Sequence, residues 1–175
     1  MIFNATIAWL DTIERAWLQM LPTRIGGIPA GLGTPHKYIL LSNDAGPALR
    51  VDAYRNSDEC FAFNDAVIWH DYLVIGWGDF AYLVHTDTGS VIKHSLGIYF
   101  GHIYADSNYL LIASGERLIR IRRDGSLQWT SDVLGIDGVI IGDVTDGIIS
   151  GEGEWDPPGG WRPFRISLDD GEQAK

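Results

Sequence analysis

The sequence holds a single cysteine, Cys60, among its 175 residues. One cysteine cannot form a disulfide within the chain, so the fold does not depend on an oxidising compartment. No uncharged apolar run approaches the roughly 20 residues that a membrane-spanning helix needs. The N-terminus lacks the basic region of a signal peptide. We therefore expect a cytoplasmic protein of bacterial type that does not enter a membrane.

Cationic residues are also scarce. The chain has 13 Lys and Arg against 23 Asp and Glu, a formal net charge of −10. Between Asp124 and Glu172 there are eleven acidic residues and two arginines. A protein that binds nucleic acid needs the opposite sign, because Lys and Arg make its phosphate contacts. The charge therefore excludes nucleic acid as a partner and predicts a basic protein partner.

Motifs for catalysis, cofactors and metals are missing as well. There is no Gly-x-Ser-x-Gly sequence, and the carboxylate of Glu59 disfavours a thiolate at Cys60. None of the five histidines belongs to a His-x-x-x-His or Cys-x-x-Cys metal-binding spacing. The glycine-rich stretch 25–35 lacks the Lys-Ser or Lys-Thr of a phosphate loop, so we expect a plain connecting loop. We predict no enzymatic activity, no cofactor and no metal site.

What the sequence does contain indicates a folded globule. Hydrophobic residues make up 46% of the chain, with seven Trp and seven Tyr. The length suits one domain, 1–175, that is large enough to bury a sizeable core. Glycine is abundant, at 21 residues. This number is typical of a fold with many tight turns.

A repeat of 37 residues organises the C-terminal two thirds of the chain. Tyr72–Gly76, Tyr109–Ala113 and Asp146–Ser150 are similar apolar segments at that spacing. Each is followed by a glycine, a second strand-like run and a polar turn, which defines repeats over 66–171. Residues 36–65 admit interpretation as a degenerate first repeat, since Tyr38 precedes Tyr72 by 34 residues. We therefore expect a mostly β fold of three to four repeats.

The strand pattern predicts propeller-like units, each of four antiparallel strands. The segments Val84–His94 and Arg120–Trp129 resemble the repeat of quinoprotein-type (PQQ-like) β-propellers, in which a strand, a polar turn and a strand with a docking Trp recur. Trp129 stands at the position of that Trp, and Lys93 or His94 takes its place in the preceding unit. The resemblance implies propeller-like sheets, but no cofactor-binding residue of that family can be matched. A closed ring, an open stack, a twisted meander and blades completed by a second chain all remain open.

One helix is expected, over residues 5–21. Apolar residues recur there at spacings of three and four, which places them on one helical face. Asn4 is a suitable N-cap and Pro22 a stop signal. We expect this helix to pack against the sheets. The residues of its apolar face are Leu10, Ile13, Trp17, Met20 and Leu21.

The candidate binding site is an acidic segment near the C-terminus. Glu152, Glu154 and Asp156 alternate, so an extended chain places their carboxylates on one face and Trp155 on the other. A Pro-Pro-Gly-Gly loop then leads to Trp161. The cluster fits a general acid/base pair for glycoside hydrolysis, a divalent-cation site, an acidic docking surface or a solvated strand edge. We favour the docking surface, with these five residues as its partner-binding residues.

Size and charge complete the functional prediction. A small, acidic, single-domain protein without catalytic machinery resembles an immunity protein, an inhibitor that neutralises a basic toxin such as a nuclease. The alternative is a carbohydrate-binding module or glycoside-active enzyme that uses the Glu152/Glu154/Asp156 cluster with Trp155 and Trp161.

Overall fold

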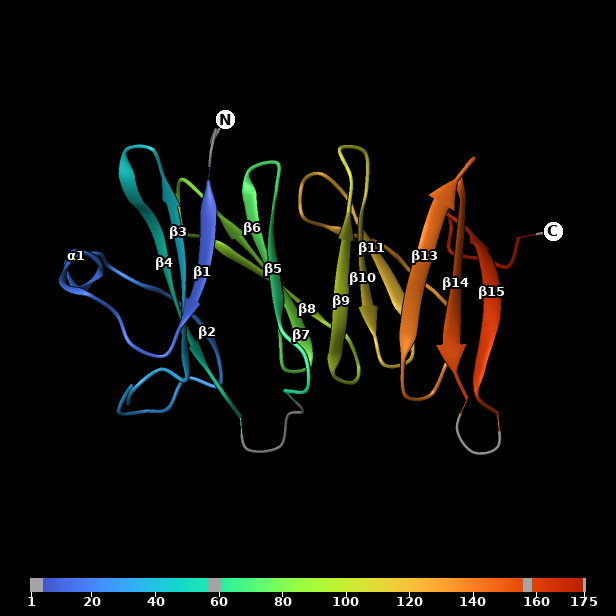
Figure 1. Cartoon of the computed structure of the whole chain (residues 1–175), viewed down its shortest axis with the longest axis horizontal. Helices are drawn as coiled ribbons and strands as arrows, with labels where there is room; N and C mark the ends of the chain where they lie inside the picture. Colours follow the sequence, from blue (N-terminus) through green and yellow to red (C-terminus); the bar gives the residue numbers. More distant parts are fainter. Residues whose placement is uncertain (1–4, 57–60, 156–158, 175) are drawn as a thin grey trace.

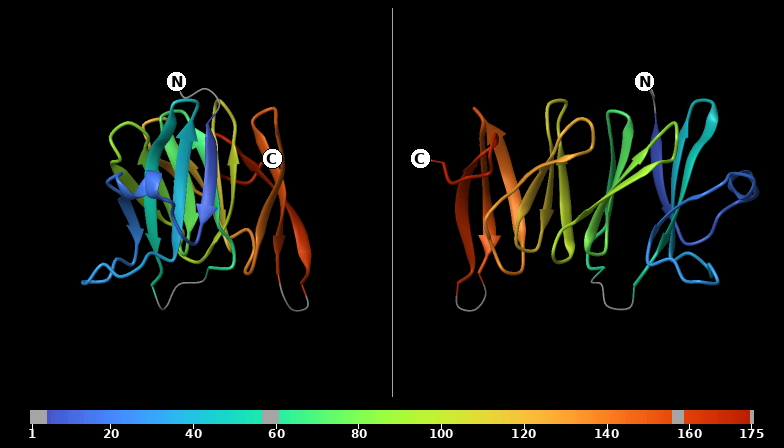
Figure 2. Two further views of the ribbon diagram at one scale, coloured as in Figure 1. Left: turned by 60° about the vertical axis from the view of Figure 1, so that its left-hand side comes forward. Right: turned by 180° about the vertical axis from the view of Figure 1, so that it is seen from behind.

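The computed structural model describes residues 5–56, 61–155 and 159–174. Four small β-sheets lie side by side along the long axis in the order of the sequence (Figures 1 and 2). The row starts at the N-terminus and ends at the C-terminus, and the sheets do not close into a ring. The chain is therefore mostly β, as predicted, with an open arrangement of its sheets.

Every sheet except the fourth has four strands. The first has the order β1-β3-β4-β2, with β2 parallel to β4 and the other pairs antiparallel. The other three follow the chain order and are wholly antiparallel. The strands are β1 (Thr6–Leu10), β2 (Thr23–Gly26), β3 (Lys37–Asn43) and β4 (Gly46–Tyr54) in the first sheet; β5 (Asp65–Trp69), β6 (Tyr72–Trp77), β7 (Phe80–His85) and β8 (Val91–Ser95) in the second; β9 (Phe100–Ala105), β10 (Leu110–Ser114), β11 (Leu118–Ile121) and β12 (Leu127–Thr130) in the third; and β13 (Val139–Thr145), β14 (Ile148–Glu154) and β15 (Trp161–Ser167) in the fourth.

The three repeated segments take equivalent positions. They correspond to β6, β10 and β14, and each is the second strand of its sheet. The first sheet has β3 in that position, but its outer strands β1 and β2 come from residues before 27. Residues 36–65 therefore supply the central strands of a sheet that the N-terminal segment completes. Residues 61–63 form no strand, and Cys60 lies outside the described residues.

The predicted helix over 5–21 is wrong. Residues 6–10 form β1, and only a four-residue helix, α1 (Arg15–Leu18), follows. β1 pairs antiparallel with β3, which turns Ile7 and Trp9 toward the core and leaves Leu10 at the surface. Pairing with a distant strand has overridden the local helical spacing. The predicted cap Asn4 lies outside the described residues, and the expected loop 25–35 starts later because Ile25 and Gly26 belong to β2.

Three hydrophobic cores lie between the four sheets. Leu73 and Ile75 of β6 pack on the first sheet, whereas Val74 packs on the third. Leu110 and Ile112 of β10 likewise face the second sheet, and Leu111 faces the fourth. The two middle sheets thus bury both of their faces, and the two end sheets bury one face against a neighbouring sheet.

The outer face of the first sheet is covered by the N-terminal segment. Arg50 forms a bidentate ion pair with Asp52, with Nε–Oδ1 and Nη2–Oδ2 distances of 2.8 and 2.9 Å. The same guanidinium donates to the backbone oxygen of Trp17, at the helix α1, and lies over the ring of Tyr38. Tyr38 and Leu40, which point outward from β3, are only 9% and 2% exposed. This end of the row is therefore closed.

One kind of hydrogen bond recurs between all neighbouring sheets. A side chain in the fourth strand of one sheet donates to a backbone oxygen in the turn after the third strand of the next sheet. Thr23 bonds Gly89 at 3.2 Å, His94 bonds Gly125 at 2.8 Å, and Trp129 bonds Leu168 at 2.9 Å. A carbonyl can only accept, so the imidazole Nε2 of His94 carries the hydrogen.

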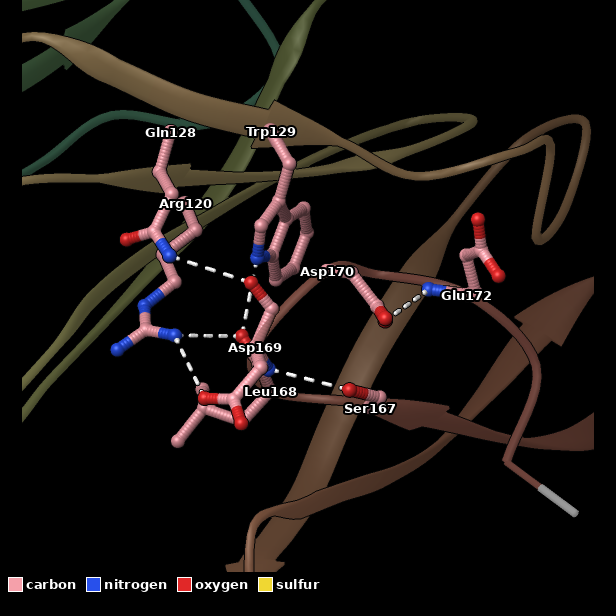
Figure 3. Close-up of polar contacts among 8 residues, drawn as sticks. All are labelled: Arg120, Gln128, Trp129, Ser167, Leu168, Asp169, Asp170 and Glu172. Atoms are coloured by element: carbon pink, nitrogen blue, oxygen red, sulfur yellow. Dashed lines mark hydrogen bonds and ion pairs between the residues drawn. The ribbon is translucent and has the colours of Figure 1, made fainter.

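The last of these contacts is the most extensive (Figure 3). Arg120 joins Trp129 in donating to the oxygen of Leu168, at 2.6 Å, and its guanidinium lies 3.7 Å from Asp169 Oδ1. Gln128 donates to the backbone oxygen of Asp169 at 3.2 Å. The turn after β15 is thereby held on β11 and on the edge strand β12 of the third sheet.

Replacing Gly76 by alanine tests the packing of the second sheet on the third. A Cβ at this position would lie inside van der Waals contact with the ring of Phe100, which is itself fully buried. We expect Gly76→Ala to lower the free energy of unfolding by about 2 to 3 kcal/mol in urea titrations. Gly31→Ala is the control, because its Cβ would meet open space. Equal effects of the two changes would contradict this packing.

Replacing Trp129 by phenylalanine tests the bond between the third and fourth sheets. The change removes the indole N–H that donates to Leu168 and leaves a smaller ring. We expect a loss of about 1 to 2 kcal/mol of unfolding free energy. Trp161→Phe, at a tryptophan that is 44% exposed, should change it by less than about 0.5 kcal/mol. If the Trp129 variant is as stable as this control, the hydrogen bond from Trp129 to Leu168 contributes nothing to the unfolding free energy.

Candidate functional site

The outward side of the fourth sheet, here called the end face, carries the acidic segment. In the register of the sheet, Glu152 lies between Ile140 on β13 and Pro163 on β15. The neighbouring residues Val139, Ile141 and Ile149 point the other way, into the third core. Unlike the outer side of the first sheet, the end face is not covered by any other described segment of the chain. Ile140 is 50% exposed and Trp161 44%.

Two hollows border the end face. The first has a volume of about 410 Å³ and includes Ile140, Glu152, Pro163 and Arg165 in its lining. The second, of about 320 Å³, lies where the fourth sheet meets the third. We call the second the aromatic hollow, because Phe63, Tyr99 and Trp161 line it, together with His102, Asp137 and Glu154.

The aromatic hollow is built from segments far apart in the sequence. The first strands of successive sheets are neighbours, β5 with β9 and β9 with β13. Phe63 precedes β5, Tyr99 precedes β9 and Asp137 precedes β13, so all three segments meet beside these strands. Trp161 and Glu154 are a cross-strand pair at the ends of β15 and β14. The hollow therefore exists only because the sheets stand side by side.

The structure shows the predicted side-by-side arrangement of carboxylates for Glu152 and Glu154 only. Glu152 and Glu154 are two positions apart in β14 and so lie on one side of the strand, but they line different hollows. Trp155 follows the strand, and its backbone N–H donates to the backbone oxygen of Gly160 at 2.9 Å. The guanidinium carbon of Arg162 lies 5.8 Å from the centroid of the Trp155 ring. Asp156 lies outside the described residues.

Polar groups in the aromatic hollow have defined surroundings. The Tyr99 hydroxyl donates to Asp137, with its oxygen 2.6 Å from the backbone oxygen and 2.9 Å from Oδ1. Burial lowers the pKa of His102, and the negative charge of Asp65 opposes this shift only in part. His102 is therefore neutral at pH 7. The lining includes two carboxylates and neither Lys nor Arg.

This arrangement bears on the chemistry that the site can perform. A glycosidase pair needs two carboxylates that flank one bond, whereas Glu152 and Glu154 line separate hollows. Among the described residues, no group of three or more His, Cys, Asp or Glu side chains is placed to hold a metal ion. Nor does any helix in the described part of the chain have the length and apolar character to cross a membrane. What the geometry offers is a surface with aromatic, apolar and acidic groups in contact, which is suited to binding.

The sequence patterns did not single out Phe63, Tyr99, His102 or Asp137. One signal was present: Tyr99 and its acceptor Asp137 are 38 residues apart, close to one repeat. Trp69 and its acceptor Asp106, which join the second and third sheets, are 37 residues apart. Residues one repeat apart can therefore be either equivalent in successive sheets or hydrogen-bonded partners across two neighbouring sheets.

The sequence matches no protein-family model, and no curated protein is similar to it.

The pH dependence of stability tests the environment of His102. Its pKa is lowered in the fold, so the unfolded chain binds the proton more readily. The neutral His102 side chain makes its full contribution to the unfolding free energy above the pKa of the unfolded chain, about 6.5. This contribution is lost as the pH falls toward the lower pKa of His102 in the folded chain. We expect the unfolding free energy to decrease between roughly pH 7.5 and pH 5.5, by at most about 1.4 kcal/mol per pH unit. In His102→Gln this decrease should be smaller, and an unchanged slope would contradict the assignment.

Proposed function

We propose that this chain is a non-enzymatic protein-binding domain whose end face docks a basic protein. The observation that carries the proposal is the exposure of the last sheet in the row. Its outward side combines half-exposed Ile140 and Trp161 with the carboxylates of Glu152 and Glu154. The opposite end of the row is closed by residues around Trp17.

The composition of the end face is that of a binding surface. Tryptophan supplies much of the binding energy at protein interfaces, where it fills a pocket on the partner. Carboxylates beside it select a partner of positive charge and increase the association rate. Most of the chain's net charge of −10 arises in the region 124–172 that includes this sheet. The partner that fits is therefore a basic protein.

Among basic proteins, a toxin such as a nuclease fits best, and the chain would then be its immunity protein. A nuclease needs a cationic surface to hold the phosphates of its substrate. An acidic protein of this size can cover such a surface and exclude the substrate. The exposed end face and the excess of acid near it support this proposal.

We also propose that the four sheets are blades of an open, propeller-like stack of the quinoprotein type. Trp129 donates to the turn of the next sheet, and His94 does so in the preceding unit. These two residues stand where the repeat pattern has its docking side chain. In this proposal the stack binds no cofactor, and its blades form a scaffold that supports the end face.

Binding kinetics with the products of neighbouring genes test the proposed function. Each product is expressed with and without this chain, and one whose toxicity the chain removes is taken as the partner. We expect that partner to be basic and its association rate to fall as salt rises, with dissociation less affected. The double change Glu152→Gln and Glu154→Gln should slow association several-fold at low salt and change the unfolding free energy by less than about 0.5 kcal/mol.

The matched control is the pair Asp71→Asn and Asp87→Asn. These exposed residues lie in turns of the second sheet, and the change removes the same amount of charge. The control pair should slow association less than the end-face pair. An acidic partner, binding indifferent to salt, or equal effects of the two pairs would refute the proposal.

A further inference from the structure

The aromatic hollow has walls suited to a flat cationic group. The rings of Phe63 and Tyr99 have their centroids 6.2 Å apart, and the Trp161 ring lines the hollow from the fourth sheet. Phe63 and Trp161 are 54% and 44% exposed, so a side chain from outside can reach both. The negative faces of aromatic rings attract cations.

A glycine gives the hollow its shape. A Cβ on Gly138 would lie 3.0 Å from Cη2 of Trp161 and 3.5 Å from Oε2 of Glu154. The indole and the carboxylate therefore rest close to the backbone of the chain that leads into β13. A Cβ at this position would crowd the indole and would make an ordinary van der Waals contact with the carboxylate.

The charges in the hollow are all of one sign. Glu154 and Asp137 line it, and Tyr99 donates to Oδ1 of Asp137, which holds that carboxylate in place. His102 is the sole basic side chain of the lining, and its lowered pKa keeps it neutral at pH 7. A cation that enters therefore meets two carboxylates and no opposing charge.

From this geometry we infer that the aromatic hollow binds one arginine side chain of the protein partner. A guanidinium is planar and weakly hydrated, so it stacks on an aromatic ring and donates to carboxylates at its edge. An ammonium group lacks both the plane and the fork of donors. A hollow of about 320 Å³ is large enough to take the side chain. This inference rests on the proposed function and names the chemistry by which the end face recognises its partner.

A titration with a small probe tests the inference without any partner. The probe is Nα-acetyl-arginine amide, and its citrulline analogue has the same shape without the charge. Binding is followed by NMR through the indole N–H signal of Trp161, which the variant Trp161→Phe identifies. We expect saturable shifts with a dissociation constant in the millimolar range, and binding of citrulline and of the lysine analogue at least about 10-fold weaker.

Variants of the full chain locate the binding. Glu154→Gln and Asp137→Asn should each weaken the binding of the arginine probe several-fold, whereas Asp71→Asn, in the second sheet, should not. The indole signal of buried Trp77 should stay in place. Equal binding of the citrulline or lysine analogue, no saturable shift, or no effect of the two variants would overturn the inference.

The two proposals fail separately. If the arginine probe binds but no basic partner exists, the proposed function is wrong and the hollow remains an arginine site. If a basic partner binds with the expected salt dependence but the probe does not bind, only the arginine inference is wrong.

Discussion

The burial of apolar side chains between successive sheets is the interaction on which the rest of this molecule depends. The inner strand β6 of a middle sheet has no solvent face: Leu73 and Ile75 enter one core, and Val74 between them enters the next. A sheet of three or four strands cannot bury both sides alone, so each repeat needs its neighbours. The hydrogen bonds of His94 and Trp129 to a turn of the following sheet add polar contacts to this packing.

A row of sheets that does not close has two ends, and each would expose an apolar face. At the first sheet, the segment before β2 covers the outer side, and the ion pair between Arg50 and Asp52 is held beneath it. At the fourth sheet, polar residues replace most of the apolar ones, but Ile140 and Trp161 stay exposed. A terminal repeat with no function needs only a polar outer face. This difference between the two ends is the physical basis for our proposal of a binding surface on the fourth sheet.

The aromatic hollow follows from the same architecture. Each sheet presents its first strand on one side of the row, and the segments that lead into β5, β9 and β13 therefore meet there. Each segment brings one or two side chains, none of which is a recognisable motif. Their combination gives aromatic walls with acidic groups, in a place where three repeats come together.

The repeated strands could be predicted from the sequence because their pattern is local. Tyr72–Gly76, Tyr109–Ala113 and Asp146–Ser150 share one apolar pattern, and each is the second strand of its sheet. Contacts between segments far apart in the sequence could be seen only in the folded chain. Residues 6–10, which the helical pattern assigned to a helix over 5–21, pair with β3 as a strand. Phe63, Tyr99 and Asp137 become neighbours only when the sheets stack. The tertiary structure also placed Glu152 and Glu154 in different hollows, although they lie on the same side of β14. The alternation of residues along a strand sets the side of the sheet on which a side chain lies, and the packing of the sheets sets which residues it contacts.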